Sequence, residues 1–540
     1  MPIDLAPFAD AGLTRAAFDT LIARHERITM PRLSALWAYY RNTLTAVALS
    51  DRGPSSRPYR LAQEQGLPAR LVGGAGIAAG LADDRAWRRK EVVIENDIAW
   101  RIHTMIDFMF GRPIAFASGA RDPALARRIE RVLDSVWEAS GGAALMQDLA
   151  LLAHVYGHVD LLVRAMPGDG ATAQNPTTDT NDEALIDAAK ASVRVEVIDP
   201  ARAVPLISTA DYRRIDAYII RSRRELPESD GVGSHGTSRA AAAMLRRWWN
   251  RVETDPGAPR SVRETIVTEI IDADWRRVYE VDGADPRGIA HLIDEGPALV
   301  GPARSAEHDE TRTRGRAGPP IVHIQNIAQP LAYEGLGEVE PLVPLQDELN
   351  TRLSDRASRV TMQSFKMFLA KGLDGLDSLP VGPGQVVLTD NPAASIETFG
   401  GDAASPSEES HIAEVREALD KVSGVPPLAA GVVRAKIGNL TSANALRVTL
   451  MGLLSRTARK RITYGRGLVQ ASRLVLDALD RAGILLTDPR DRELRVVWPD
   501  PLPPSETDAL AAAEKKLALG VPRQQVLAEL GYSAIEPGVS

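Results

Sequence analysis

Cysteine is missing from this chain of 540 residues. Without thiols, neither a disulfide framework nor a thiolate-bound metal site can form. The first residues, MPIDLAPFADAGLTRAAF, lack a basic stretch followed by an apolar core, so we expect no signal peptide. A hydrophobic content of 44% and a charged content of 25% are those of an ordinary soluble globular protein, and the length allows two to four domains with sizeable cores.

Long uninterrupted apolar runs and a basic excess are missing as well. The apolar stretch ALMQDLALLAHVYGHVDLLV is interrupted by Asp148, His154, His158 and Asp160, so we expect no membrane span. The net charge is −7, whereas a protein that grips duplex DNA tightly normally carries a dense basic surface. A mildly acidic protein would hold DNA weakly and let it slide past. Mild acidity is common in many classes of protein, however, so it is compatible with this function without indicating it.

Nucleotide-binding and catalytic signatures are also missing. The chain contains no GxxxxGK[ST] loop, no GxSxG elbow and no HRD or DFG motif. Its carboxylates are numerous but scattered, and none of them forms a recognisable catalytic dyad. We therefore expect no enzymatic activity and no cofactor.

One pair of histidines has the spacing of metal ligands. In HVYGH, His154 and His158 are four residues apart, as two ligands on one helical face would be. A zinc protease would need glutamate where Val155 stands, and Gly157 weakens a helix at this point. A packed or solvated pair of histidines is therefore favoured over a metal site.

One glycine-rich stretch, LVGGAGIAAG, nearly matches a dinucleotide-binding loop through Gly74 and Gly76. Such a loop needs a strand before it and a helix that leads to a second strand after it. Only Leu71 and Val72 precede the glycines as an apolar run, and the following residues lead to a helix alone. A flexible arm is favoured.

The densest basic run of the chain is RTARKRITYGR, from Arg456 to Arg466. It allows two interpretations. It is either a solvated helix face or a surface that contacts phosphates or an acidic partner. The residues concerned are Arg456, Arg459, Lys460 and Arg461.

Hydrophobic periodicity predicts helices at both ends and strands in the middle of the chain. Ile94, Ile98, Ile102, Met105 and Met109 predict a helix that ends at Gly111. Ser405 and Glu408 form a predicted capping box for a helix that begins at Pro406 and ends at Gly424. Further helices are expected at ARRIERVLDSVWEASGG and from about Ser442, and strands at VRVEVIDP, RIDAYIIRSR and SVRETIVTEIIDADWRRVYEVDG.

The stretch from Gly335 to Gly372 combines a Gly-rich acidic turn with a long helical pattern. The strand pattern IVHIQN (residues 321–326) precedes it, and the helix is expected to end at Gly372. Taken alone, the stretch is typical of an ordinary amphipathic helix after an edge strand. Its apolar stripe consists of Leu342, Leu345, Leu349, Leu353 and Val360, and its polar remainder of Asp347, Asn350, Asp355, Arg356 and Arg359.

Five segments, in order, resemble a family of tailed-phage portal proteins of the siphovirus type over roughly residues 90 to 535. They are ENDIAWRIHTMIDFMFGRP, HVYGHVDLLVRA, IVHIQN with GLGEVEPLVPLQDELN, VSGVPPLAAGVVRAKIGNLTSANALR, and WPDPLPPSETDALAAAEKKLALGVPRQQVLAELGY. Each motif is loose, but their order is specific. The chain departs from the family where Leu336-Gly337-Glu338 replaces a Ser-Asp turn, and residues 1 to 90 match nothing in it.

The resemblance implies a mostly helical α+β subunit that forms a dodecameric ring. It further implies an N-terminal arm with helices (1–90), an α/β wing (91–255), wing strands and clip (256–335), a stem helix (336–372), a tunnel-loop region with a long wing helix (373–425) and a helical crown (426–540). In this family the stem helix lines a DNA channel. We therefore expect Leu345, Leu349 and Leu353 to be buried, and Arg352, Arg356 and Arg359 to face polar surroundings or carboxylates such as Asp347 or Asp355 of a neighbouring subunit. Tunnel-loop candidates are Asp374, Asp377 and Asp390, which would make that loop acidic.

The function implied is that of a phage or prophage-derived portal at one capsid vertex. The expected partners are further copies of the chain, the terminase large subunit, connector or adaptor proteins, the major capsid or scaffolding protein, and double-stranded DNA. The expected location is the virion, and the host cytoplasm during assembly. Two alternatives remain open at this point: a nucleotide-cofactor enzyme that uses Gly74 and Gly76, and a non-viral ring-forming scaffold.

Overall fold

The computed structural model of the protein describes residues 3–41, 93–166, 182–227, 262–283, 285, 288–299, 318–364, 367–371, 392–393, 395–399, 405–430, 447–502, 506–523, 526–527 and 530. The chain divides into two compact units. The first comprises Met1–Ser34, Met109–Gly337 and Ala458–Pro501, and the second Ala35–Phe108, Glu338–Thr457 and Leu502–Ser540. No helix in the described part of the chain is both long enough and apolar enough to cross a membrane.

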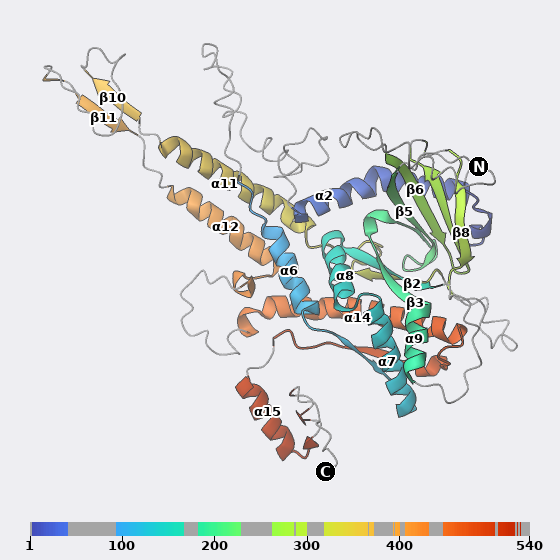
Figure 1. Ribbon diagram of the computed structural model, residues 1–540. Helices are drawn as coiled ribbons and strands as arrows, with labels where there is room; N and C mark the ends of the chain where they lie inside the picture. The colour runs from blue at the N-terminus through green and yellow to red at the C-terminus, as the bar shows by residue number, and fades with distance from the viewer. Residues whose placement is uncertain are drawn as a thin grey trace, which may run out of the picture. The chain divides into compact units, whose positions relative to one another are not determined.

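A five-stranded antiparallel sheet dominates the first unit (Figure 1). Its order is β4 (Ala203–Ile207), β5 (Ile215–Pro227), β6 (Val262–Ile271), β7 (Trp275–Asp282) and β8 (His291–Pro297). Alternate residues of β5 serve two different cores, because side chains of a strand point to opposite faces. Ala217 and Ile219 pack with Phe8 and Phe18, whereas Tyr218 packs with Ile321 and its neighbours.

The N-terminal elements of the first unit cover one face of this sheet. They are η1 (Ala6–Phe8), α1 (Arg15–Arg24), the π-helical turn η2 (His25–Thr29) and the start of α2 (Met30–Arg41). The Thr14 side chain caps α1 by accepting a hydrogen bond from the backbone N–H of Ala17 at 3.2 Å.

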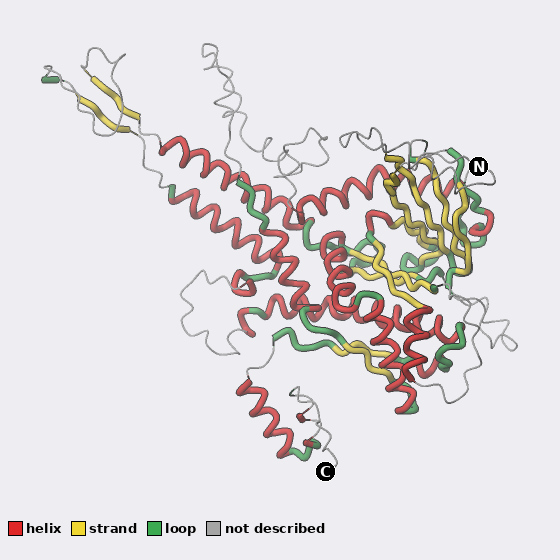
Figure 2. Tube along the Cα trace, viewed as in Figure 1, coloured by secondary structure: helices red, strands yellow, loops and turns green. Residues whose placement is uncertain are grey.

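A three-stranded sheet, in the order β3–β2–β9, forms the other layer of the first unit. Helices and short strands surround it (Figure 2). The strands are β2 (His158–Ala165), β3 (Val193–Ile198) and β9 (Ile321–Gln325), and the helices are α7 (Pro123–Ala139), α8 (Gly142–Tyr156), α9 (Asp182–Ser192), and the 3-10 turns η4 (Pro200–Arg202) and η9 (Pro489–Asp491). A separate ribbon pairs β1 (Ala115–Ser118) with β12 (Leu494–Val497).

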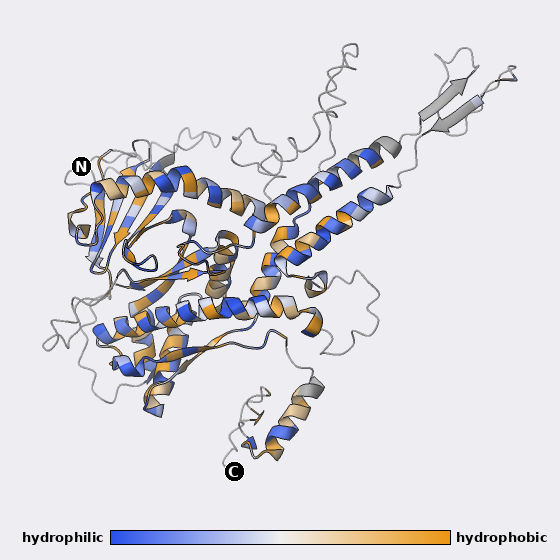
Figure 3. Cartoon of the chain, turned by 180° about the vertical axis from the view of Figure 1, so that it is seen from behind, coloured by the Kyte–Doolittle hydropathy of each residue, from blue (hydrophilic) through white to orange (hydrophobic). Residues whose placement is uncertain are grey.

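The second unit is mainly helical. It holds most of α6 (Asp97–Phe110), η6 (Glu340–Leu342), α11 (Val343–Ser364), α12 (Pro406–Ser423), η8 (Pro427–Ala430), the first turns of α14 (Met451–Arg481), and α15 (Glu506–Ala518). A hairpin of β10 (Met367–Lys371) and β11 (Ser395–Phe399) joins α11 to α12 along the chain. Hydrophilic residues recur along α11 and α12 (Figure 3).

Most expected elements are confirmed, but the long helix after Gly335 is shorter than predicted. It begins at Val343 and ends at Ser364, and Met367–Lys371 forms a strand instead of the last helical turn before Gly372. A short apolar run such as MFLAK fits a buried strand as well as a helix. Pairing with β11, which comes more than 20 residues later, decides in favour of the strand.

Candidate functional site

Helix α11 buries its apolar stripe only in part. Leu349 is 0% and Leu353 5% exposed, which confirms two of the three leucines expected to be buried. Leu345 is only half-buried, and Val360 is 43% exposed. The stripe is therefore buried at Leu342, Leu349 and Leu353, and it reaches the surface only at Val360.

A second buried face of α11 is polar. Gln346, Asn350 and Ser354 follow one another at intervals of four residues, and all three are buried. They accept hydrogen bonds from the backbone of the segment that leads into α6. Val93 N–H donates to Ser354 Oγ at 3.0 Å, Glu95 N–H to Asn350 Oδ1 at 3.0 Å, and Asp97 N–H to Gln346 Oε1 at 3.1 Å.

These three hydrogen bonds can form together because the spacing of the acceptors along α11 matches the spacing of the donors along the extended segment. Four helical residues rise about 6.0 Å, and two residues of extended backbone about 6.6 Å. Side-chain oxygens of α11 thus accept the backbone hydrogen bonds that a neighbouring strand would otherwise accept. Asn350, which belongs to the polar remainder of the helical pattern, is buried because its amide satisfies a buried backbone group.

The three arginines of α11 are partly exposed, as expected for the polar side of the helix. Arg352 donates to Glu348 at 2.8 Å and to Asp355 at 3.2 Å, both on its own helix. Arg359 donates to Glu408 of α12. Whether these arginines and Arg356 line a channel stays a prediction.

Asp347, named above as a possible partner of these arginines, instead accepts a hydrogen bond from the hydroxyl of Tyr39 at 2.9 Å. Burial raises the pKa of Asp347 to about 6, although this hydrogen bond acts in the opposite direction. The carboxyl group is therefore poised to change charge in mildly acidic solution.

Helix α12 lies beside α11 (Figure 1). It begins at Pro406 and ends before Gly424 in a left-handed conformation, as predicted. The predicted capping box does not form, because Ser405 makes no side-chain cap and Glu408 accepts from Arg359. A charge-assisted bond between the helices is stronger than a neutral bond to a backbone N–H. The exposed acidic residues of α12 are Glu409, Glu414 and Glu417.

The basic run of α14 does not form one solvated face, because Lys460 is buried. Whether any of the four residues contacts phosphates or an acidic partner stays a prediction. Successive residues of a helix point in directions about 100° apart, and the four side chains go to different surroundings. Arg456 donates to the carbonyls of Val422 (2.8 Å) and Ser423 at the end of α12. Arg459 is exposed, Lys460 is only 2% exposed, and Arg461 lies over the ring of Trp498.

The two histidines of HVYGH do not share a helical face. Helix α8 ends at Tyr156, and Gly157 adopts φ +93°, so His158 is the first residue of β2. His154 Nδ1 lies 2.6 Å from the carbonyl of Ala150, and its Nε2 lies 2.9 Å from Nζ of Lys460. Both histidines are buried, which confirms the packed interpretation, and burial lowers the pKa of His158 to about 4. Among the described residues, no group of three or more histidines and carboxylates could hold a metal ion.

Segments that carried the resemblance meet at one point in the first unit. Gly157 follows α8, Asn326 follows β9, and Gly335 and Gly337 form the turn before η6. A Cβ on Gly157 would lie 2.2 Å from the carbonyl oxygen of Gly335, and a Cβ on Gly335 would lie 2.3 Å from that of Gly157. The Asn326 N–H donates to the Gly157 carbonyl at 2.8 Å. The glycines are thus required by close backbone approach.

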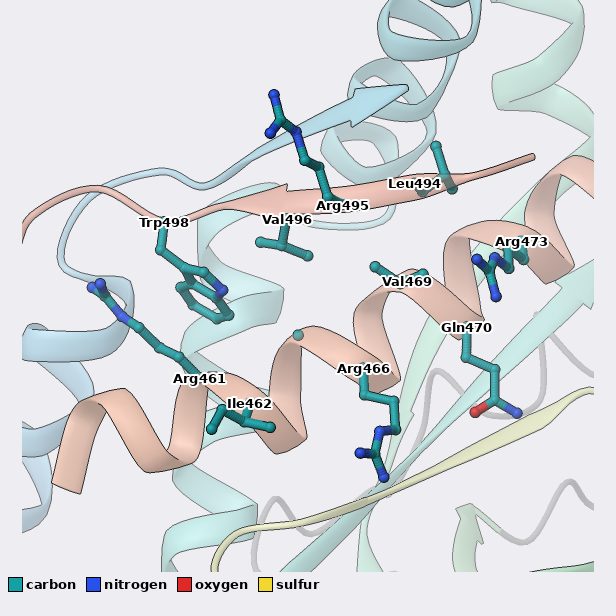
Figure 4. A pocket seen from close by; sticks show the side chains of 11 residues that line it. Arg461, Ile462, Arg466, Val469, Gln470, Arg473, Leu494, Arg495, Val496 and Trp498 are labelled. Carbon is teal, nitrogen blue, oxygen red and sulfur yellow. The ribbon is translucent and has the colours of Figure 1, made fainter. Parts of the chain in front are cut away.

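A groove between α14 and β12 was not foreseen, because the strand at Leu494–Val497 was not predicted. Its volume is about 440 Å³. Val469 from the helix and Val496 from the strand point toward each other, with Trp498 and Arg461 at one end and Arg473 at the other (Figure 4). Arg466 and Arg495 also line the groove, and no aspartate or glutamate does. In the sequence, only the alternation of apolar and polar residues in RELRVVW indicates this strand.

Several predicted site residues lie outside the described residues. They are the tunnel-loop candidates Asp374, Asp377 and Asp390 and the glycines Gly74 and Gly76.

Comparison with known proteins identifies the family. The family described as "Phage portal protein, SPP1 Gp6-like" matches residues 102–531, which is most of the chain. The chain belongs to this family of phage portal proteins. No curated protein matches the sequence significantly.

Two solved structures are similar at low identity. One is described as "Virion of native gene transfer agent (GTA) particle", with 13% identity, a TM-score of 0.39, and coverage of 86% of this chain and 98% of that chain. The other is "Neck of empty GTA particle computed with C6 symmetry", with 13% identity, a TM-score of 0.38, and coverage of 79% and 90%. Likeness at this level adds nothing to the family assignment.

Proposed function

We propose that this protein forms a closed ring, with twelve copies as the expected number, through which double-stranded DNA enters and leaves a capsid at one vertex. The observation that carries the proposal is the family match over residues 102–531, which includes most of α6 and the whole of α11, α12 and α14. Within the proposal, the domain borders follow the resemblance with two changes. The stem helix ends at Ser364, and α12, which the resemblance places in the wing, is grouped with the stem helix.

The paired helices α11 and α12 are proposed to line the channel. Arg359 and Glu408 join them, and His411 of α12 lies 3.0 Å from Glu348 of α11. Exposed carboxylates on α12 support this role, because like charges repel the phosphates of passing DNA and limit adhesion. Such a wall lets DNA slide.

The proposed ring docks the terminase large subunit during packaging and connector or adaptor proteins afterwards, and it contacts the major capsid or scaffolding protein. It hydrolyses nothing itself, since the motor belongs to the terminase. It would be found in the virion, and in the host cytoplasm during assembly.

Negative-stain microscopy and mass photometry of the purified chain test the proposal. We expect closed rings with a central hole. A monomer mass at every protein and salt concentration would overturn the ring. A search of the neighbouring genes for a terminase, followed by a DNA-packaging assay with that terminase, then separates a portal from a non-viral scaffold. A scaffold would have no such neighbour, or would form rings that support no packaging.

A further inference from the structure

One exposed leucine in the first unit lies in a strained conformation. Leu331, in the loop between β9 and η6, has φ +59° and is the only residue other than glycine with a positive φ in the described part of the chain. Its side chain is 81% exposed. A bulky residue in this region of φ is unfavourable, and an apolar side chain in water gains nothing. Asparagine or glycine would avoid both costs, so the isolated subunit gives no reason for a leucine.

The loop is held in place by side chains beneath it. The Tyr333 hydroxyl donates to the fully buried Asp160 at 2.9 Å, and His323 Nε2 lies 2.7 Å from the Tyr333 carbonyl. Gln325 donates to the carbonyl of Ala332 at 2.8 Å. Leu331 is therefore presented on an ordered loop, which lowers the entropy cost of inserting it into a partner.

The same unit carries a surface that complements this loop. The groove between α14 and β12 has apolar walls at Val469, Val496 and Trp498, arginines around them, and no carboxylate in its lining. Three residues after Leu331 the loop carries Glu334, whose side chain is partly exposed. An apolar residue followed by an acid matches an apolar groove bordered by arginines.

We propose that Leu331 of one copy inserts into the α14–β12 groove of the adjacent copy, with Glu334 against the arginines of that groove. The inference rests on the proposed ring and names one of its contacts. Leu331 is too exposed to fill the groove of its own chain. A second copy is the occupant because one chain carries both complementary surfaces, and a head-to-tail interface that closes into a ring needs both on every copy.

Cross-linking tests the contact directly, since the chain has no cysteine of its own. Leu331→Cys and Val469→Cys chains, each with a different tag, are co-expressed and treated with a short bis-maleimide. We expect a cross-linked dimer that carries both tags, several-fold more abundant than any dimer formed by either variant alone. No mixed dimer from particles that are rings by microscopy, or an equal yield from Leu331→Cys alone, would overturn the contact.

A charge placed at the loop tip provides the second test. Leu331→Asp should leave the unfolding midpoint of the subunit unchanged but reduce the fraction of rings at least tenfold. Leu486→Asp, at another exposed leucine of the same unit, should form rings normally. Normal rings of Leu331→Asp would overturn the contact and leave the ring itself standing. Absence of rings from the unaltered chain would overturn the proposed function, and the contact with it.

Discussion

The ammonium group of Lys460 lies 2.9 Å from Nε2 of His154, and both side chains are buried. Because Nδ1 of His154 lies 2.6 Å from the Ala150 carbonyl, that nitrogen carries the proton and Nε2 accepts from Lys460. Two residues that the sequence offered as ligands for a metal and for phosphate are thus one structural contact between α8 and α14.

This contact predicts an unequal cost for its two partners. His154→Leu should lower the free energy of unfolding by roughly 3 kcal/mol, because it removes a hydrogen-bond acceptor from a buried charge. Lys460→Met should cost less, about 1–2 kcal/mol, because it leaves the neutral Nε2 of His154 without its Lys460 donor and no buried charge behind. The double variant should be more stable than His154→Leu alone. Urea unfolding measures all three, and a double variant less stable than either single one would contradict this account.

Leu349 should be the residue on which α11 depends most for packing. Leu349→Ala should lower the free energy of unfolding by roughly 2–5 kcal/mol, because the side chain is fully buried. The matched change Arg356→Ala, on the partly exposed side of the same helix, should stay within about 0.5 kcal/mol. Thermal unfolding of the two variants checks the order, and the reverse order would mean that the helix is turned the other way.

The contact between Gly157 and Gly335 predicts a difference between two glycines with similar backbone angles. Gly157→Ala places a Cβ 2.2 Å from the Gly335 carbonyl oxygen, whereas Gly12, at φ +79°, has nothing within 4 Å. Gly12→Ala should cost about 1–2 kcal/mol from the left-handed conformation alone. Gly157→Ala should cost several kcal/mol more or prevent folding, as judged by soluble yield and melting temperature. Equal effects would show that the two backbones do not approach closely.

The raised pKa of Asp347 predicts a pH dependence of stability. The folded-state pKa of about 6 lies above the ordinary value of 3.8, so the folded state holds its proton more tightly than the unfolded state does. The stability from this group is fully present below about pH 3.8 and is lost as the pH rises through about 6. Asp347→Asn keeps an acceptor for Tyr39 and should therefore gain up to about 3 kcal/mol relative to the unaltered chain between pH 4 and 7. A stability difference that does not change with pH would contradict the assignment.

The exposed acidic residues of α12 predict that reversing their charge makes DNA adhere. Glu409→Lys combined with Glu414→Lys should raise the affinity of the assembled protein for duplex DNA, and this gain should fall steeply with salt. Lysines at Glu493 and Glu514, which are exposed but lie outside α12, serve as the control. Fluorescence anisotropy at two salt concentrations measures both double variants. An equal gain in DNA affinity from the control variant would show that the net charge of the protein, and not the position of the charges on α12, determines the affinity.

The amino-acid sequence by itself determined the local elements and the family. Ile98, Ile102 and Met105 predicted the buried face of α6, and the glycines at 111 and 424 predicted where α6 and α12 end. These features can be predicted from the sequence because helical periodicity and the conformational freedom of glycine depend on residues only a few positions apart.

The tertiary structure alone decided where the polar side chains go. Gln346 meets Asp97, which is 249 residues away, and Lys460 meets His154, which is 306 residues away. The local sequence around each residue does not indicate its distant partner. Lys460 was therefore expected on a solvated face or a contact surface, and it is buried. For the same reason the β10 strand and the α14–β12 groove could not be predicted, because a strand and a groove both need a second element that only the fold brings near.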